Sequence, residues 1–155
     1  MKVPISILVL CALLALAGCG GGDSSSETTS TVKKTQPTIE VPKGAPPKKL
    51  VIEDIEEGTG EAAKAYDVVT VQYAGVNYKS GKEFDSSWSR NEPFSFNLGA
   101  GEVIPGWDKG IAGMKVGGRR ELIIPSQLAY GETGRPPTIP PNETLIFVVD
   151  LLAAE

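Results

Sequence analysis

Apolar and polar residues alternate along several short segments in the last two thirds of the chain. Val69, Val71 and Tyr73 fall on one face of residues 68–78, and polar side chains separate Val69, Val71 and Tyr73 from one another. A period of two residues is typical of a β-strand that buries one face in an antiparallel sheet. We therefore predict strands in five segments: 50–57, 68–78, 94–98, 122–124 and 145–151.

A different spacing occurs between the third and the fourth of these segments. Trp107, Ile111 and Met114 stand at positions i, i+4 and i+7 within residues 106–114, which is the spacing of one face of a helix. Strands with a single short helix predict an α+β fold, in which one antiparallel sheet is covered by that helix. Two irregular stretches remain, 84–92 and 126–142, and binding residues often lie on such loops.

Composition limits the folded domain to the C-terminal part of the 155-residue chain. All the aromatic residues lie between Tyr66 and Phe147, so the first third lacks the material for a core. The formal charge is −4, and residues 50–155 contain 9 Lys and Arg against 16 Asp and Glu, a balance of −7. We expect no nucleic-acid partner, because such binding needs a clustered basic face.

Missing residue types exclude several classes of chemistry. The chain has no histidine, and its two cysteines, Cys11 and Cys19, both lie near the N-terminus. These facts exclude Ser-His-Asp and Cys-His catalysis, zinc binding and a disulfide framework. Gly99 and Gly101 are not followed by the third glycine or the distant acidic residue of a dinucleotide-binding loop. We therefore expect neither a metal nor a cofactor.

The N-terminus is typical of a bacterial lipoprotein. After Met1-Lys2, residues 3–17 form an apolar run of 15 residues, shorter than the roughly 20 that span a bilayer. It ends in Leu16-Ala17-Gly18-Cys19, which resembles the lipobox, where a diacylglyceryl group is attached to the cysteine and the preceding peptide bond is cut. We expect residues 1–18 to be the signal peptide and Cys19 to be lipidated. The alternative is an ordinary secretory signal with a chance cysteine.

The segment after Cys19 has the composition of a flexible tether. Residues 20–49 contain three glycines in a row, a run rich in serine and threonine, and a stretch with lysine and proline, with almost no apolar residue to bury. We expect residues 19–49 to be a disordered tether and residues 50–155 to be the folded domain. A lipidated cysteine would hold this domain at the extracytoplasmic face of a bacterial cell membrane without spanning it.

Seven motifs occur in order along residues 50–155. They are Tyr73-Ala74-Gly75, Phe84-Asp85-Ser86-Ser87, Pro93-Phe94-Ser95-Phe96, Gly101-Glu102-Val103-Ile104-Pro105-Gly106-Trp107, Leu128-Ala129-Tyr130-Gly131, Ile139-Pro140-Pro141-Asn142 and Leu145-Ile146-Phe147. In this order and spacing they resemble the FKBP-type peptidyl-prolyl cis-trans isomerases. The resemblance implies a bent antiparallel sheet of about five strands wrapped on one short helix, with a proline-binding pocket between them.

The resemblance also implies the residues of the pocket, position by position. The Ile104 amide N–H and the Tyr130 hydroxyl would each bind a substrate carbonyl, and Trp107 would form the floor beneath the proline ring. The substrate-binding positions implied beside them are Tyr73, Phe84, Phe94, Val103, Ile139 and Phe147. Together these residues would form an apolar, aromatic binding pocket.

A fourth catalytic residue, Asp85, is implied to orient the site through hydrogen bonds to Tyr73 and Arg90. The chemistry is compatible with the absence of histidine and cysteine, because no bond breaks when a peptide bond rotates over its barrier of about 18–20 kcal/mol. The twisted amide is less charge-separated than the planar one. A pocket of aromatic side chains that excludes water therefore favours the transition state.

These observations predict a membrane-anchored prolyl isomerase that accelerates X-Pro rotation while exported proteins fold. The expected partners are proline-containing exported polypeptides, the membrane through the lipid anchor and, by resemblance, macrolide immunosuppressants. Arg135 and Thr138 stand where relatives contact ligand edges, and Arg135 replaces a histidine that is frequent in eukaryotic members. The alternative is a binding module or holdase chaperone that keeps the proline pocket and mainly holds its clients.

Overall fold

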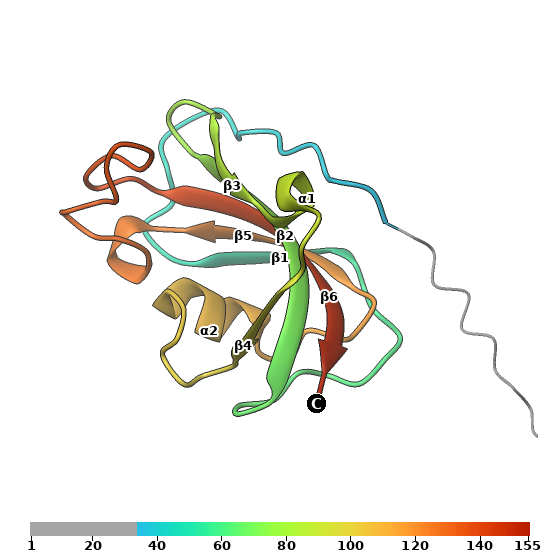
Figure 1. Cartoon of the computed structure of the whole chain (residues 1–155). Helices are drawn as coiled ribbons and strands as arrows, with labels where there is room; N and C mark the ends of the chain where they lie inside the picture. The colour runs from blue at the N-terminus through green and yellow to red at the C-terminus, as the bar shows by residue number, and fades with distance from the viewer. Residues whose placement is uncertain (1–33) are drawn as a thin grey trace, which may run out of the picture. The chain divides into compact units, whose positions relative to one another are not determined.

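The computed structural model describes residues 34–155 and shows six strands in one antiparallel sheet (Figure 1). The elements are β1 (Val51–Glu56), β2 (Val68–Asn77), β3 (Glu83–Ser86), α1 (Ser87–Arg90), β4 (Phe94–Asn97), α2 (Pro105–Ile111), β5 (Arg119–Ile124), the 3-10 turn η1 (Ser126–Leu128) and β6 (Leu145–Ala154). The strand order is β1-β5-β6-β2-β3, and β4 also pairs with β2. The predicted α+β class is confirmed, with six strands where we expected about five.

The additional strand is β3, in the stretch 84–92 that we expected to be irregular. It has four residues and pairs with β2, where Asp85 lies opposite Gly75. A strand of this length is too short to show a period in the sequence. Helix α1 follows directly, and the Ser86 hydroxyl caps it by accepting a hydrogen bond from the Ser89 amide.

The predicted helix forms but is shorter than residues 106–114. Helix α2 begins at Pro105, which suits a first turn because proline has no amide hydrogen to leave unpaired. It ends at Ile111, and Gly113 follows with φ +77°, a left-handed conformation that stops a helix. Met114 lies beyond the helix but is still buried. Its position at i+7 therefore indicated a residue of the core and not the extent of the helix.

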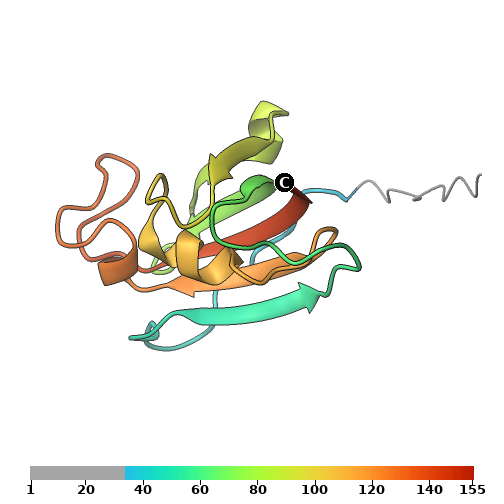
Figure 2. The same cartoon turned by 90° about the horizontal axis from the view of Figure 1, so that it is seen from below.

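Helix α2 lies against one face of the sheet (Figure 2). Two glycines make the close approach to β5 feasible, because a Cβ on Gly106 would collide with Ile124 and one on Gly110 would collide with Leu122. The core on this face includes Val69, Val71, Tyr73, Phe96, Leu98, Trp107, Ile111, Leu122, Ile124, Phe147 and Val149. The alternating residues of the long strands thus point into the core as predicted.

The other face of the sheet is covered by side chains from residues 34–49. We call this segment the N-terminal strap. Ile39 and Val41 pack there against a second apolar cluster. The buried members of this cluster are Val76, Tyr78, Ile123 and Ile146. In β5 and β6 these residues alternate with those under α2, so they point to the opposite face of the sheet.

The folded unit therefore begins earlier than the boundary we expected at residue 50. The compact unit spans Lys34–Glu155 and includes the strap. Two isolated apolar residues among prolines and lysines gave no local sign of this packing. The predicted signal peptide, Cys19 and residues 20–33 lie outside the described residues. Within residues 34–155, no helix is long and apolar enough to cross a membrane.

Candidate active site

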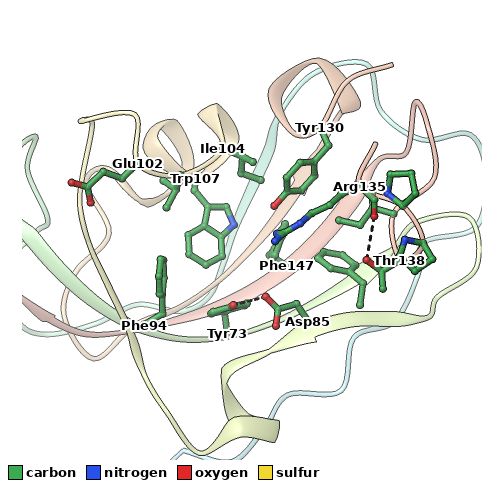
Figure 3. A pocket seen from close by; sticks show the side chains of 15 residues that line it. Tyr73, Asp85, Phe94, Glu102, Ile104, Trp107, Tyr130, Arg135, Thr138 and Phe147 are labelled. Carbon is green, nitrogen blue, oxygen red and sulfur yellow. Dashed lines mark hydrogen bonds between the residues drawn. The ribbon is translucent and has the colours of Figure 1, made fainter. Parts of the chain in front are cut away.

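A cavity of about 810 Å³ opens between α2, the sheet and the segment that precedes β6 (Figure 3). All ten residues predicted for catalysis and substrate binding line it. They are Tyr73, Phe84, Asp85, Phe94, Val103, Ile104, Trp107, Tyr130, Ile139 and Phe147. The structure thus brings into one pocket residues from four strands, one helix and two loops.

The floor of the pocket is the indole of Trp107, which is 4% exposed. The ring of Tyr73 meets the indole edge-on with centroids 5.0 Å apart, and the ring of Phe147 does so at 5.2 Å. Edge-to-face contacts fix the ring orientations and add to the burial energy of the aromatic side chains. Within residues 34–155 the buried Trp107 Nε1–H has no hydrogen-bond partner.

Two hydrogen-bond donors at the pocket are unpaired within the described part of the chain. Ile104 is the N-cap of α2, and its carbonyl accepts from Trp107 while its amide N–H donates to no residue there. The Tyr130 hydroxyl, on a half-buried side chain after η1, likewise has no partner among residues 34–155. Both groups are therefore available to a ligand, as expected for donors that bind substrate carbonyls.

One side of the pocket is polar and consists of three connected side chains. The Tyr73 hydroxyl donates to Asp85 Oδ2 at 2.6 Å, and Arg90 Nη2 donates to the Tyr73 hydroxyl at 2.9 Å. Arg90 also forms an ion pair with Asp85, and its guanidinium lies 5.7 Å from the centroid of the Tyr73 ring. The contacts predicted for Asp85 are thus present.

This network keeps the Tyr73 phenol neutral over the whole physiological range. Burial and the hydrogen bond to Asp85 raise the pKa of Tyr73 to about 12, although the nearby Arg90 acts in the opposite direction. Hydrogen bonds to Tyr73 and Asp85 raise the pKa of Arg90 in turn. The Tyr73 phenol and the Arg90 guanidinium therefore keep their protonation states near neutral pH.

The rim of the pocket contains Arg135 and Thr138, which the resemblance implied as ligand-edge positions. It also contains Glu102, Pro136 and Pro137, which we did not assign to the site. The Arg135 guanidinium lies 6.0 Å from the centroid of the Tyr130 ring, and the Thr138 hydroxyl donates to the Arg135 carbonyl at 3.3 Å. The proline-rich composition of residues 126–142 marked the loop but not which of its side chains face inward.

The conformation of the loop before β6 depends on Gly134. Its φ is +64°, and a Cβ there would lie 2.5 Å from the carbonyl oxygens of Ile139 and Pro140. This turn lets the backbone groups of Arg135 and Ile139 pair with each other at 2.8 and 3.0 Å. Arg135 and Thr138 are thereby held at the pocket rim, at positions fixed by a turn that the apolar pattern does not reveal.

Comparison with known proteins agrees with this geometry. Residues 59–152 match the family model of the FKBP-type peptidyl-prolyl cis-trans isomerases. An FK506-binding protein of Streptomyces anulatus is 56% identical over 119 residues, which is 76% of this chain and 96% of that protein. An FK506-binding protein of Neisseria meningitidis is 50% identical over 103 residues, which is 66% of this chain and 94% of that protein.

Solved structures show the same fold. FkpA from Escherichia coli superposes with a TM-score of 0.63 at 50% identity, over 68% of this chain and 48% of that chain. The present chain therefore spans about half the length of FkpA. AtFKBP13 superposes with a TM-score of 0.65 at 36% identity, over 71% of this chain and 96% of that one.

The family model and the named relatives, which agree with the aromatic pocket, identify the class of protein as a peptidyl-prolyl cis-trans isomerase. The chain belongs to the FKBP-type peptidyl-prolyl cis-trans isomerase family.

Proposed function

We propose that this chain is a lipid-anchored prolyl isomerase that assists the folding of exported polypeptides at the extracytoplasmic face of a bacterial cell membrane. The observation that carries the enzymatic part is the pocket, in which all ten residues expected of an FKBP-type site lie together. The anchoring part is supported by the sequence Leu16-Ala17-Gly18-Cys19 after an apolar run.

The proposed mechanism needs only binding and orientation. The proline ring sits on the indole of Trp107, and the aromatic walls exclude water from the amide as it twists. The Ile104 N–H and the Tyr130 hydroxyl each hold a substrate carbonyl, so that the chain on either side stays fixed while the X-Pro bond rotates. A ten-thousandfold acceleration needs about 5.4 kcal/mol of preferential binding to the twisted state.

Asp85 acts as a positioning residue in this mechanism. It accepts the hydrogen bond of Tyr73 and pairs with Arg90, which keeps the Tyr73 ring at the side of the pocket. The raised pKa of Tyr73 means that no proton has to be gained or lost there near neutral pH. We therefore expect kcat/KM to be nearly constant between pH 6 and pH 9.

Anchoring is tested by Cys19→Ala in the full chain expressed in bacterial cells. We expect the wild type to partition into the detergent phase and the variant to remain unprocessed or soluble, because no thiol remains for lipid attachment. Prolyl isomerase activity of the domain should be unchanged. The anchor is refuted if Cys19→Ala still partitions into detergent with the mobility of the wild type.

Catalysis and client holding are separated by proline-limited refolding of a reduced test protein. A catalyst accelerates refolding at a small fraction of the substrate concentration, whereas a holdase acts only near equimolar amounts and slows release. Because relatives are named as FK506-binding proteins, we also propose that FK506 occupies this pocket. FK506 should then inhibit the acceleration, and equal refolding rates with and without FK506 would exclude that occupancy.

A further inference from the structure

A second, smaller hollow of about 330 Å³ lies next to the proline pocket. Phe84, Pro137 and Thr138 line both cavities, so the two share a wall. Thr138 is seen at the end of the proline pocket in Figure 3, beside Arg135. The other lining residues of the second hollow are Asn77, Ser80, Lys82, Glu83 and Pro140. The second hollow is therefore adjacent to the pocket in which we place the X-Pro bond.

Asn77 gives the hollow an acceptor that nothing else in the described part of the chain uses. The side chain is at the end of β2 and is 4% exposed. Its Nδ2 donates to the Thr138 carbonyl at 3.0 Å, which fixes the orientation of the amide, and its Oδ1 has no hydrogen-bond partner within residues 34–155. A buried acceptor without a donor is unfavourable, so a donor that enters the hollow would be bound.

The backbone of Asn77 cannot supply that donor. Its own N–H donates to the Lys82 carbonyl at 3.0 Å, and its carbonyl accepts from the Gly81 N–H at 2.8 Å. Both bonds belong to the turn between β2 and β3. The side-chain Oδ1, which is buried, is therefore the polar atom of Asn77 that has no partner within residues 34–155.

The hollow is lined by one basic and one acidic residue, Lys82 and Glu83. Glu83 already accepts hydrogen bonds from Gln36 at 2.9 Å and from Ser89 at 3.3 Å. Lys82 is exposed, and its ammonium has no ion-pair partner among residues 34–155. Lys82 is therefore a cation at the hollow that can pair with an acidic group of a ligand, in a domain whose residues 50–155 carry 16 acidic against 9 basic residues.

We propose that the second hollow is a substrate subsite that binds the polypeptide chain flanking the X-Pro bond. A backbone N–H of the substrate donates to Asn77 Oδ1, and an acidic side chain of the substrate pairs with Lys82. The inference rests on the proposed function, because it places the X-Pro bond in the neighbouring pocket. This subsite makes the enzyme sensitive to the residues that flank the X-Pro dipeptide. Peptides too short to extend into the hollow would not show this preference.

The charge preference is tested with decapeptides that contain one X-Pro bond and a single Glu or Lys, moved through each flanking position. At one position, we expect kcat/KM of the wild-type chain to favour Glu over Lys by up to about fivefold, the upper limit for an exposed ion pair. Lys82→Glu should reverse the preference at that position. Lys64→Glu is the matched control, since Lys64 is an exposed lysine that lines neither cavity, and it should leave the preference as it is.

Two results would overturn the charge preference. One is the absence of any position at which Lys82→Glu changes the ratio of Glu to Lys peptides. The other is an equal change of this ratio in Lys82→Glu and Lys64→Glu, which would show that the overall charge of the domain, and not a contact with Lys82, sets the ratio. Peptide affinity is measured beside the rates. Peptides that bind but do not isomerise would refute the proposed catalysis, and the subsite would then be judged on affinities alone.

The hydrogen bond is tested in the wild-type chain, which avoids any loss of folding. In the same decapeptides, each flanking amide N–H is replaced in turn by an ester oxygen. We expect one replacement to lower kcat/KM about threefold to tenfold, as for a lost hydrogen bond. In Asn77→Ala, kcat/KM should be the same for that ester peptide and for the corresponding amide peptide. If no ester lowers kcat/KM, or if Asn77→Ala keeps the distinction, Asn77 does not bind the substrate.

Discussion

The two faces of the sheet are covered in different ways. On the face under α2, the rings of Tyr73, Trp107 and Phe147 meet at their edges and leave a cavity. On the other face, Ile39 and Val41 of the N-terminal strap close over a small aliphatic and tyrosine cluster. Large rings held edge-to-face do not fill space completely, whereas small branched side chains under a strap can do so.

Polar groups differ between the two faces in the same way. At the pocket, the Ile104 N–H and Trp107 Nε1–H have no partner within residues 34–155. Near the strap, Asp150 is 1% exposed and binds two cations, with Arg119 at 2.7 Å and Lys34 at 3.8 Å. One face keeps donors for a ligand, and the other satisfies its charges internally. Changes on the strap face should therefore affect stability alone, whereas changes at the pocket should affect activity.

The largest effect is expected for Trp107→Ala, which should lower both the free energy of unfolding and kcat/KM. Removing a buried tryptophan destabilises a domain by about 3–5 kcal/mol, and the indole is also the floor of the pocket. Urea unfolding gives the stability, and a cis/trans assay gives kcat/KM. Trp107→Phe is the control, since it keeps a ring and should retain part of both. Unfolding within about 1 kcal/mol of the wild type would show that Trp107 contributes little to the core.

A loss of similar size, but in stability alone, is expected for Arg119→Met. The change leaves the buried Asp150 carboxylate with only the more distant Lys34, and breaking a buried pair costs about 3 kcal/mol or more. The folded variant should keep its kcat/KM. Lys115→Met is the matched control, because it breaks the exposed pair with Glu57 and should leave the free energy of unfolding almost unchanged. Equal losses for both would contradict the difference between the buried and the exposed pair.

The same two faces show what the sequence could predict. Alternation in residues 68–78 and 145–151 identified the two long strands, and the motifs identified every residue of the proline pocket that we named. Strand alternation is a local signal, and the motifs have a fixed spacing along the chain. The strap was missed because Ile39 and Val41 have no period, and their packing depends on Ile123 and Ile146, far away in the sequence.

At the rim of the pocket, the resemblance implied Arg135 and Thr138 as ligand-edge positions, but the apolar pattern alone did not show that they face the cavity. A turn at Gly134 with φ +64° places them there, and apolar periodicity carries no information about turns. Asn77 is a single amide near the end of a strand and, in sequence, resembles a solvated residue. Only the contact with Thr138 shows that it is buried and half satisfied.

Tyr73→Phe should have a smaller effect on stability, one that depends on pH. Near neutral pH the change removes the hydrogen bonds to Asp85 and Arg90, at a cost of about 1.5–3 kcal/mol for bonds to charged groups. The pKa of Tyr73 is raised to about 12 in the folded state, against about 10 when unfolded. The unfolded chain therefore loses this proton first as the pH rises.

The stabilisation due to Tyr73 is consequently complete below pH 10 and decreases up to about pH 12. The measurement is urea unfolding of the wild type and of Tyr73→Phe at several values between pH 8 and pH 12. The difference between the two chains should be constant up to pH 10 and then shrink. Other groups that titrate in this range cancel in the difference. A constant difference at every pH would show that the Tyr73 pKa is not raised on folding.

The smallest effect is expected for removal of one hydroxyl at the pocket, and it sharpens the comparison of the two faces. Tyr130→Phe removes a donor that has no partner within residues 34–155 and that we assign to a substrate carbonyl. One hydrogen bond is worth about 0.5–1.5 kcal/mol, so kcat/KM should fall about threefold to tenfold. Tyr78→Phe is the same chemical change on the strap face, outside both cavities. It should leave kcat/KM unchanged. If both variants keep the rate of the wild type in the cis/trans assay, the Tyr130 hydroxyl does not hold the substrate, and orientation by the Ile104 N–H and the aromatic walls is sufficient.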